Sequence, residues 1–348
     1  MTDLLFDERR WQVLTAVLVE YVETTEPVGS RAVAKRYRLG LSPATIRNTM
    51  ADLEEMGYLS QPHPSAGRVP TDKAYRFYVD HLAGDLDLPP AETAELRRHY
   101  AAPGGTEQLM EQTSFHLSAL SRMTGVLLAP PLKQTVLARI ELIPLSNERA
   151  LALVATEARW ITTRTLSLDS PIAADDLREV GRQLTRRFRG KTFQEILEEL
   201  SAPADPLDPL RARAGTLVDQ VFSLLRDRTL YVGGAINILD HPEFWDITTM
   251  RTLLRVFEEK DRLIDLLSQQ AEENGVQVMI GRENPYAEMQ ECSLVTSTYT
   301  YRDQRLGILG VLGPKRMPYP RVITLVEETA RLMSRALSRQ RQELYLLS

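Results

Sequence analysis

The side chains best suited to chemistry lie in one basic window near the N-terminus. From Pro27 to Ala51 the sequence contains no Asp or Glu. The basic residues of this window are Arg31, Lys35, Arg36, Arg38 and Arg47. Such local positive charge favours contact with a polyanion, although the whole chain carries a net charge of −5. Asn48 adds an amide that can pair bidentately with adenine, as arginine can with guanine.

Three predicted helices position this window. Asp7 is expected to cap the first helix, which ends at the turn 26–29. A short second helix is expected from Arg31 to Tyr37, with Ser30 as its cap. The pair Ser42-Pro43 supplies an N-cap followed by proline at the first helical position, so a third helix begins there. The spacing of the second and third helices is typical of a helix-turn-helix.

The faces of the third helix separate core residues from potential base readers. Ile46, Met50 and Leu53 fall on one side at about 100° per residue and are expected to face the core. Asn48 lies nearly opposite them, and the acidic residues are confined to the C-terminal half. A helix with this polarity can insert its N-terminal residues into the major groove. The residues expected to contact bases are Ser42, Ala44, Thr45, Arg47 and Asn48.

A hairpin follows the third helix in the position of a wing. Residues 58–61 and 68–70 have the character of two short strands, separated by a tip rich in Pro and Gly. His63 lies in this tip, and Arg68 stands where a phosphate or minor-groove contact is expected. The residues expected to support DNA binding outside the third helix are Arg31, Lys35, His63 and Arg68.

The ordinary interpretation of a basic helix with hydroxyl and amide side chains is a solvated surface. This segment, however, combines helix-turn-helix spacing, an acid-free window and a following wing. Together these features favour a DNA-binding domain over residues 1–83.

Six motifs along the chain are distinctive: Ser42–Asn48, Leu53–Leu59, Gln61–Thr71, Asn284-Pro285, Cys292–Val295 and Gly313–Met317 with Tyr319. Together they resemble the HrcA family of bacterial heat-inducible transcription repressors. Because the motifs lie near both ends, the resemblance covers almost the whole chain and is weakest over about 172–250.

The resemblance implies an α+β multidomain fold. A GAF-like α+β domain would follow the N-terminal winged helix-turn-helix and carry an inserted, mostly helical dimerising domain. The expected boundaries are a linker at 84–106, the GAF-like domain at 107–171 and 251–348, and the insert at 172–250. Strands are expected within 135–167, at Tyr231–Leu239 and from 276 to 312, before a long C-terminal amphipathic helix.

Two features invite an enzymatic interpretation. Gly307, Gly310 and Gly313 suggest a phosphate loop, but their spacing is wrong and the segment has the pattern of a strand. Cys292 has no histidine near it in sequence, so a buried strand residue is favoured over a nucleophile. Gly233-Gly234 is expected to mark a bulge or close backbone packing. No enzymatic activity is expected.

Composition excludes some classes of protein. A single cysteine rules out an intrachain disulfide, and the five histidines lack ligand-like spacing, so neither metal nor cofactor is expected. The N-terminus has no signal-peptide pattern, and no segment approaches the roughly 18 apolar residues of a membrane span. The expected location is the cytoplasm, with association to the nucleoid when DNA is bound.

The resemblance also implies a function. It predicts a homodimeric repressor that binds double-stranded DNA at an inverted-repeat operator of the CIRCE type, upstream of chaperone operons. Heat would inactivate the repressor, and the chaperonin GroEL would keep it active. Two alternatives stay open: a winged-helix regulator that senses a small molecule through its GAF-like domain, and a structural or chaperone-associated protein that does not touch DNA.

Overall fold

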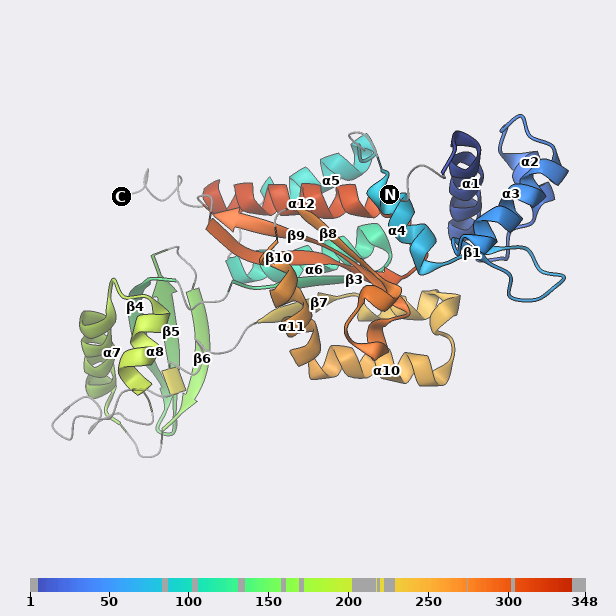
Figure 1. Ribbon diagram of the computed structural model, residues 1–348. Coiled ribbons are helices and arrows are strands. Elements are labelled where there is room, and N and C mark those ends of the chain that lie inside the picture. Colours follow the sequence, from blue (N-terminus) through green and yellow to red (C-terminus); the bar gives the residue numbers. More distant parts are fainter. Residues whose placement is uncertain are drawn as a thin grey trace.

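The molecule consists of three lobes in a row (Figure 1). The computed structural model describes residues 6–82, 87–101, 106–130, 135–157, 161–168, 172–201, 217, 220–221, 229–273, 275–301 and 304–339. A winged-helix lobe lies at one end, a central lobe built on a five-stranded sheet follows, and a small lobe with a three-stranded sheet lies at the other end. The expected α+β multidomain fold with an N-terminal winged helix is confirmed.

The winged-helix lobe contains the three predicted helices and the predicted hairpin, and a fourth helix follows them. They are α1 (Glu8–Thr24), α2 (Ser30–Arg36), α3 (Pro43–Glu55), β1 (Leu59–Ser60), β2 (Val69–Pro70) and α4 (Asp72–Asp80). Asp7 caps α1 by accepting a hydrogen bond from the Arg10 amide at 2.8 Å, and Ser42 caps α3, as expected. Ser30, in contrast, is the first residue of α2 and Gly29 is its N-cap, so the predicted cap was wrong by one position.

The central lobe is a sheet covered by helices on both faces. Its strand order is β7-β3-β10-β9-β8, with every neighbouring pair antiparallel. The strands are β3 (Thr124–Leu128), β7 (Leu230–Gly233), β8 (Val276–Ile280), β9 (Cys292–Tyr301) and β10 (Gln304–Pro314). The helices are α5 (Pro90–Ala101), α6 (Thr106–Ser121), α10 (Ile247–Glu259), α11 (Asp261–Gln270) and α12 (Tyr319–Arg339).

Alternation along the strands explains the two covered faces. In β3, Leu127 belongs to the core beneath α6 and α12, whereas Val126 and Leu128 belong to the core beneath α10 and α11. Both sets are buried, so β3 is a continuous apolar run directly after a helix. For that reason the alternating pattern that marks a half-buried strand is missing, and β3 was not predicted.

Glycines allow α6 to approach the sheet closely. Gly125 of β3 pairs with Gly233 of β7. A Cβ atom on Gly233 would lie 2.5 Å from the Phe115 amide nitrogen of α6. The expectation of close backbone packing at Gly233-Gly234 is confirmed. The predicted strand Tyr231–Leu239 is shorter than expected, because Gly234 turns the chain at φ 62° into a 3-10 helix, η3 (Ala235–Asp240).

The small lobe differs from the expected domain boundaries. It contains β4 (Leu137–Ser146), β5 (Arg149–Thr156) and β6 (Ile161–Ser167), in the order β4-β5-β6, with α7 (Ala174–Phe188) and α8 (Phe193–Ser201). The strands within 135–167 therefore pair with one another rather than with the central sheet, and β7 belongs to that central sheet. The insert begins before β4 and ends before β7, instead of spanning 172–250, and it includes a sheet as well as helices.

The apolar face of α7 packs against the core of the small lobe. Leu177, Val180, Leu184 and Phe188 all join the core beneath the β4–β6 sheet. The inserted domain was expected to mediate dimerisation, but this apolar face of its first helix is buried within one chain. The helical spacing of Leu217, Val221, Leu224 and Leu225 predicts another helix in this insert, and most of that segment lies outside the described residues.

Two further expectations concern β9 and β10. Cys292 is fully buried in β9, and burial raises the pKa of its thiol to about 12, so the prediction of an inert strand cysteine is confirmed. Gly307, Gly310 and Gly313 all lie within the strand β10 rather than in a phosphate-binding turn. None of the helices in the described ranges is long and apolar enough to span a bilayer.

Candidate DNA interface

The N-terminal half of α3 projects from the winged-helix lobe. Ser42, Ala44, Arg47 and Asn48 are exposed, whereas Ile46 is fully buried. Thr45 is half-buried, and its hydroxyl lies 2.9 Å from that of Ser42. The first turn contains no acidic residue, so the partial positive charge of the helix N-terminus is not cancelled locally. The helix presents the set of side chains that the sequence predicted to contact bases.

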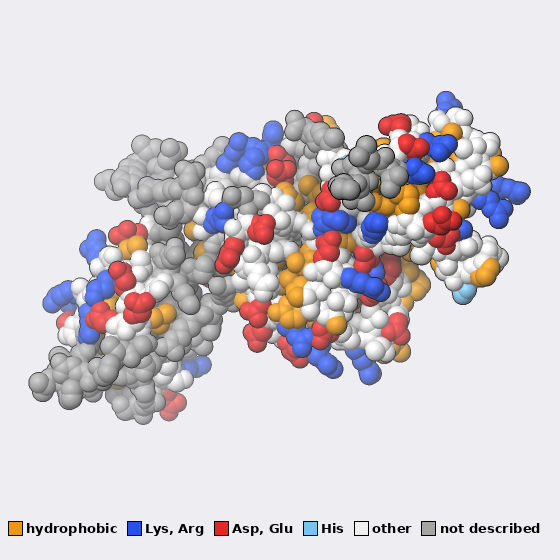
Figure 2. All heavy atoms as spheres, viewed as in Figure 1, with side chains coloured by type: hydrophobic (Ala, Val, Ile, Leu, Met, Phe, Trp, Pro, Cys, Tyr) orange, Lys and Arg blue, Asp and Glu red, His pale blue; other side chains and the backbone are white. Residues whose placement is uncertain are grey.

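Basic side chains surround this face. Arg31, Lys35, Arg38 and Arg47 are all exposed. Among the described residues none of these four forms an ion pair or side-chain hydrogen bond. Figure 2 shows Lys and Arg side chains gathered at this end of the molecule. Their charges are free to meet phosphate groups.

The nearby acids, in contrast, are largely neutralised by other cations. Arg36 pairs with Glu20 at 2.9 Å and also with Glu23. Arg10 lies 3.5 Å from Asp52 in the C-terminal half of α3. These pairs remove negative charge from the flanks of the reading face without using the basic residues that surround it.

The wing has a fixed tip. Its strands pair through Leu59 with Pro70 and Ser60 with Val69. Gln61 donates side-chain hydrogen bonds to the carbonyl oxygens of Pro64 and Ala66, both at 2.9 Å. His63 is exposed at this closed tip, which is compatible with the contact predicted for it.

Arg68 does not have the exposed position that the sequence suggested. Its guanidinium Nη2 lies 2.8 Å from Glu54 Oε2, and only 19% of the side chain is exposed. Its backbone forms two hydrogen bonds with Val28, each of 2.9 Å. Arg68 thus joins the wing to α3 and to the loop before α2, because the carboxylate of Glu54 satisfies the charge that was expected to meet a phosphate.

The winged-helix lobe docks on the central lobe through α4. Arg76 donates to Glu283 at 2.7 and 2.5 Å and to the Val278 carbonyl oxygen at 2.6 Å. The first of these contacts raises the pKa of Arg76, so the side chain stays charged. Asp72 accepts a hydrogen bond from the Arg282 amide at 3.1 Å and lies 3.3 Å from Lys315 Nζ.

Arg316 and Tyr319 supply a second group of contacts between the two lobes. Arg316 pairs with Glu243 and donates to the Val22 carbonyl oxygen of α1 at 3.2 Å. Tyr319 packs with its ring 5.8 Å from that of Tyr75. The segments 281–284 and 313–319, which contain Asn284 and the motif Gly313–Met317 with Tyr319, therefore form this docking contact. Sequence reasoning found these motifs but did not assign them a structural role.

Comparison with known proteins identifies the family. The family model described as "Winged helix-turn-helix transcription repressor, HrcA DNA-binding" matches residues 7–81. The model described as "HrcA protein C terminal domain" matches residues 107–323. The chain belongs to the HrcA family.

Relatives within the HrcA family align over nearly the whole chain. The heat-inducible transcription repressor HrcA of Geobacter sulfurreducens is 42% identical over 343 residues, which cover 97% of this chain and 99% of the relative. That of Pelotomaculum thermopropionicum is 38% identical, covering 96% of this chain and 97% of the relative. A crystal structure of a protein described as hypothetical has a TM-score of 0.67 at 22% identity, covering 96% of this chain and 99% of that one, and shows similarity of fold.

Membership of the HrcA family establishes the general activity. The chain is a heat-inducible transcription repressor with a winged-helix DNA-binding domain. HrcA proteins are repressors and not enzymes, so the expectation of no enzymatic activity is confirmed by the family.

Proposed function

We propose that two copies of the chain bind an inverted-repeat operator of the CIRCE type upstream of chaperone operons and repress their transcription. The observation that carries this proposal is the exposed N-terminal half of α3, where Arg47 and Asn48 project beside unpaired basic side chains. Arginine and asparagine at the start of a recognition helix have the geometry to read guanine and adenine.

The proposal assigns different roles to the residues around this helix. Ser42, Ala44, Thr45, Arg47 and Asn48 contact base edges. Arg31 and Lys35 contact phosphates from α2, and His63 contacts DNA from the wing tip. Arg68 acts as a positioning residue that fixes the wing through Glu54, which supports a revision of the direct contact expected from sequence.

A dimer follows from the size of the reading surface. A single helix contacts too few base pairs for specificity against a genome. Two copies related by a twofold axis read two half-sites whose centres are separated by a near-integral number of helical turns. We propose that the body supplies the dimer contacts. Exposed apolar side chains of the central lobe, Trp245 at 63% and Ile247 at 67%, support association there.

The operator geometry can be tested with the full chain. We expect tight binding to a chaperonin promoter fragment with the inverted repeat, and a large loss when about five base pairs are inserted between half-sites, because one reading head then faces the wrong side of the duplex. An insertion of about ten base pairs restores the helical phase and serves as the control. Equal binding to all three fragments would contradict the twofold arrangement.

Regulation by heat is proposed to act through folding. Mild heating loosens the body and the docking contact, so the dimer loses operator affinity, and GroEL restores the chain to its active form. Purified protein should lose operator binding after a modest temperature rise and regain it when GroEL and ATP are added. Recovery with neither chaperonin nor ATP, on addition of a small molecule alone, would instead favour a ligand-responsive regulator. We propose that the chain acts in the cytoplasm, associated with the nucleoid when it is bound to DNA.

A further inference from the structure

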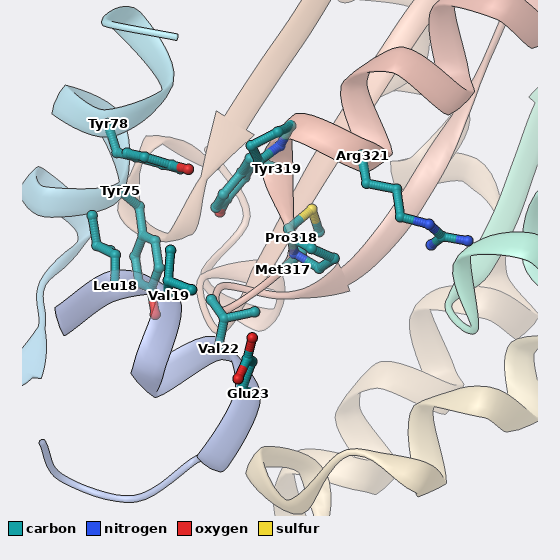
Figure 3. A pocket seen from close by; sticks show the side chains of 11 residues that line it. Leu18, Val19, Val22, Glu23, Tyr75, Tyr78, Met317, Pro318, Tyr319 and Arg321 are labelled. Atoms are coloured by element: carbon teal, nitrogen blue, oxygen red, sulfur yellow. The ribbon is translucent and has the colours of Figure 1, made fainter. Parts of the chain in front are cut away.

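A cavity of about 220 Å³ lies between the winged-helix lobe and the central lobe (Figure 3). One wall is the C-terminal part of α1 and the adjacent part of α4, and the other wall is the segment 317–321 that begins α12. The residues that line it are Leu18, Val19, Val22, Glu23, Tyr75, Tyr78, Met317, Pro318, Tyr319, Pro320 and Arg321. Neither lobe encloses this space by itself.

The lining is apolar and rich in aromatic rings. Tyr75, Tyr78 and Tyr319 contribute rings to the walls, and Met317 contributes a thioether, which packs favourably against aromatic groups. Burial raises the pKa of Tyr75 and Tyr78, so both hydroxyls are neutral. The walls therefore offer surface for a flat ring rather than for an ion.

The two charged residues at the rim are already engaged. Glu23 pairs with Arg36, and Arg321 donates to Glu92 at 2.9 Å and to the Leu120 carbonyl oxygen at 2.8 Å. A charged ligand would lose its hydration without gaining a free partner. The chemistry of the cavity consequently selects a neutral molecule.

The volume limits the size of that molecule. An apolar cavity of ~150 Å³ engineered in another protein binds benzene. A space of about 220 Å³ has room for one or two fused rings. Cavities at the boundary between domains are common ligand sites.

We propose that this cavity binds a small neutral aromatic molecule of one or two rings, and that its binding holds the winged-helix lobe on the central lobe. The site lies at the docking contact and is distinct from ligand sensing inside the GAF-like domain. Because both lobes supply its walls, the ligand binds only the docked arrangement and stabilises it by mass action. This inference goes beyond the proposed operator and chaperonin, and it needs neither for its test.

Indole is a suitable probe, and its binding to the full chain can be measured by isothermal titration calorimetry. We expect saturable binding to the native protein and a rise in Tm at saturating indole. Val22→Phe fills the cavity from α1 and should weaken indole binding at least about tenfold, a loss of about 1.4 kcal/mol. Gln12→Phe on the same helix adds the same ring away from the lining and should bind indole like the native protein.

A second pair of variants tests the link to docking. Arg76→Ala removes the contact with Glu283 outside the cavity, and it should lower indole affinity several-fold because the docked arrangement is less populated. Val19→Ala enlarges the cavity and should improve binding of 1-naphthol relative to indole, which keeps the test valid if Val22→Phe does not fold.

Three results would contradict the proposal. The cavity is not a ligand site if indole shows no saturable binding to the native chain, or if Val22→Phe and Gln12→Phe bind it equally. Unchanged indole affinity in Arg76→Ala would reject the link to docking. All of these measurements are made without DNA, so their failure is distinguishable from failure of the proposed operator recognition.

Discussion

Arg68 and Glu54 form an ion pair with 2.8 Å between Nη2 and Oε2, and this pair ties the base of the wing to the C-terminal half of the recognition helix. A Cβ atom on the preceding residue, Gly67, would lie 2.5 Å from the Val28 backbone, so the wing is also held closely against the loop before α2. Contacts within the lobe therefore set the angle between the wing and the recognition helix before the protein binds DNA.

Replacing either partner of this pair should misplace the wing. Arg68→Ala and Glu54→Ala should each weaken operator binding by about 1 kcal/mol, and the double variant should lose little more, because all three break one contact. The slope of log K against log salt should stay unchanged, because no phosphate contact is lost. A slope lowered by about one unit in Arg68→Ala alone would show direct contact with phosphate.

Base readers and phosphate contacts should respond differently to DNA sequence. Arg47→Ala or Asn48→Ala should cost about 1–3 kcal/mol on the operator and little on random DNA. Lys35→Ala, an exposed residue of α2, should weaken binding to both and flatten the salt slope by about one unit. Equal losses on operator and random DNA for Asn48→Ala would remove that residue from the base-reading set.

The pair Arg76–Glu283 should couple the two lobes. A double-mutant cycle of Arg76→Ala and Glu283→Ala on the free energy of unfolding should give a coupling of about 1 kcal/mol, since both side chains are partly exposed and screened by solvent. The double variant Arg76→Glu with Glu283→Arg exchanges the two charges, so it should recover part of the free energy of unfolding that each single variant loses. Asp80→Ala, which removes the other partner of Arg76 within α4, is the control and should cost only about 0.3–0.5 kcal/mol. A coupling of zero would show that apolar packing alone holds the docking contact.

Gly233 should tolerate no larger residue. Gly233→Ala places a methyl group against the α6 backbone, and such overpacking should lower the free energy of unfolding by about 1–3 kcal/mol in denaturant titrations. Gly29→Ala, where no atom lies within 4 Å of the added Cβ, is the matched control and should cost much less. Similar losses in both variants would indicate a backbone effect rather than crowding.

His99 should make the protein less stable in mild acid. Burial, with a smaller contribution from His116, lowers the pKa of His99 from 6.5 to about 4. Between these values the unfolded chain binds the proton and the folded chain does not, so stability is complete above pH 6.5 and falls as the pH drops toward 4. The loss should be about 1 kcal/mol after allowance for solvent screening. Comparison of Tm from pH 7.5 to 5 for the native chain and His99→Phe checks this, because the variant should lack that part of the decline.

The winged-helix lobe could be predicted almost completely from the sequence. The caps at Asp7 and Ser42, the acid-free window and the wing all depend on residues within a few positions of one another. The helical periodicity of α3 also correctly predicted that Ile46 is buried and Asn48 is exposed. Local hydrogen bonding and side-chain periodicity act over one or two turns, so the sequence alone contains this information.

Other features were decided by tertiary structure. Strands β4, β5 and β6 form one sheet and β3 belongs to another, and no local sequence pattern indicates which strands pair. Arg68 meets Glu54, and Arg76 meets Glu283 across 207 positions of sequence. An arginine has the same charge and reach whether its partner is a phosphate or a carboxylate. Only the packing of the lobes, which brings distant segments together, determines which of these it contacts.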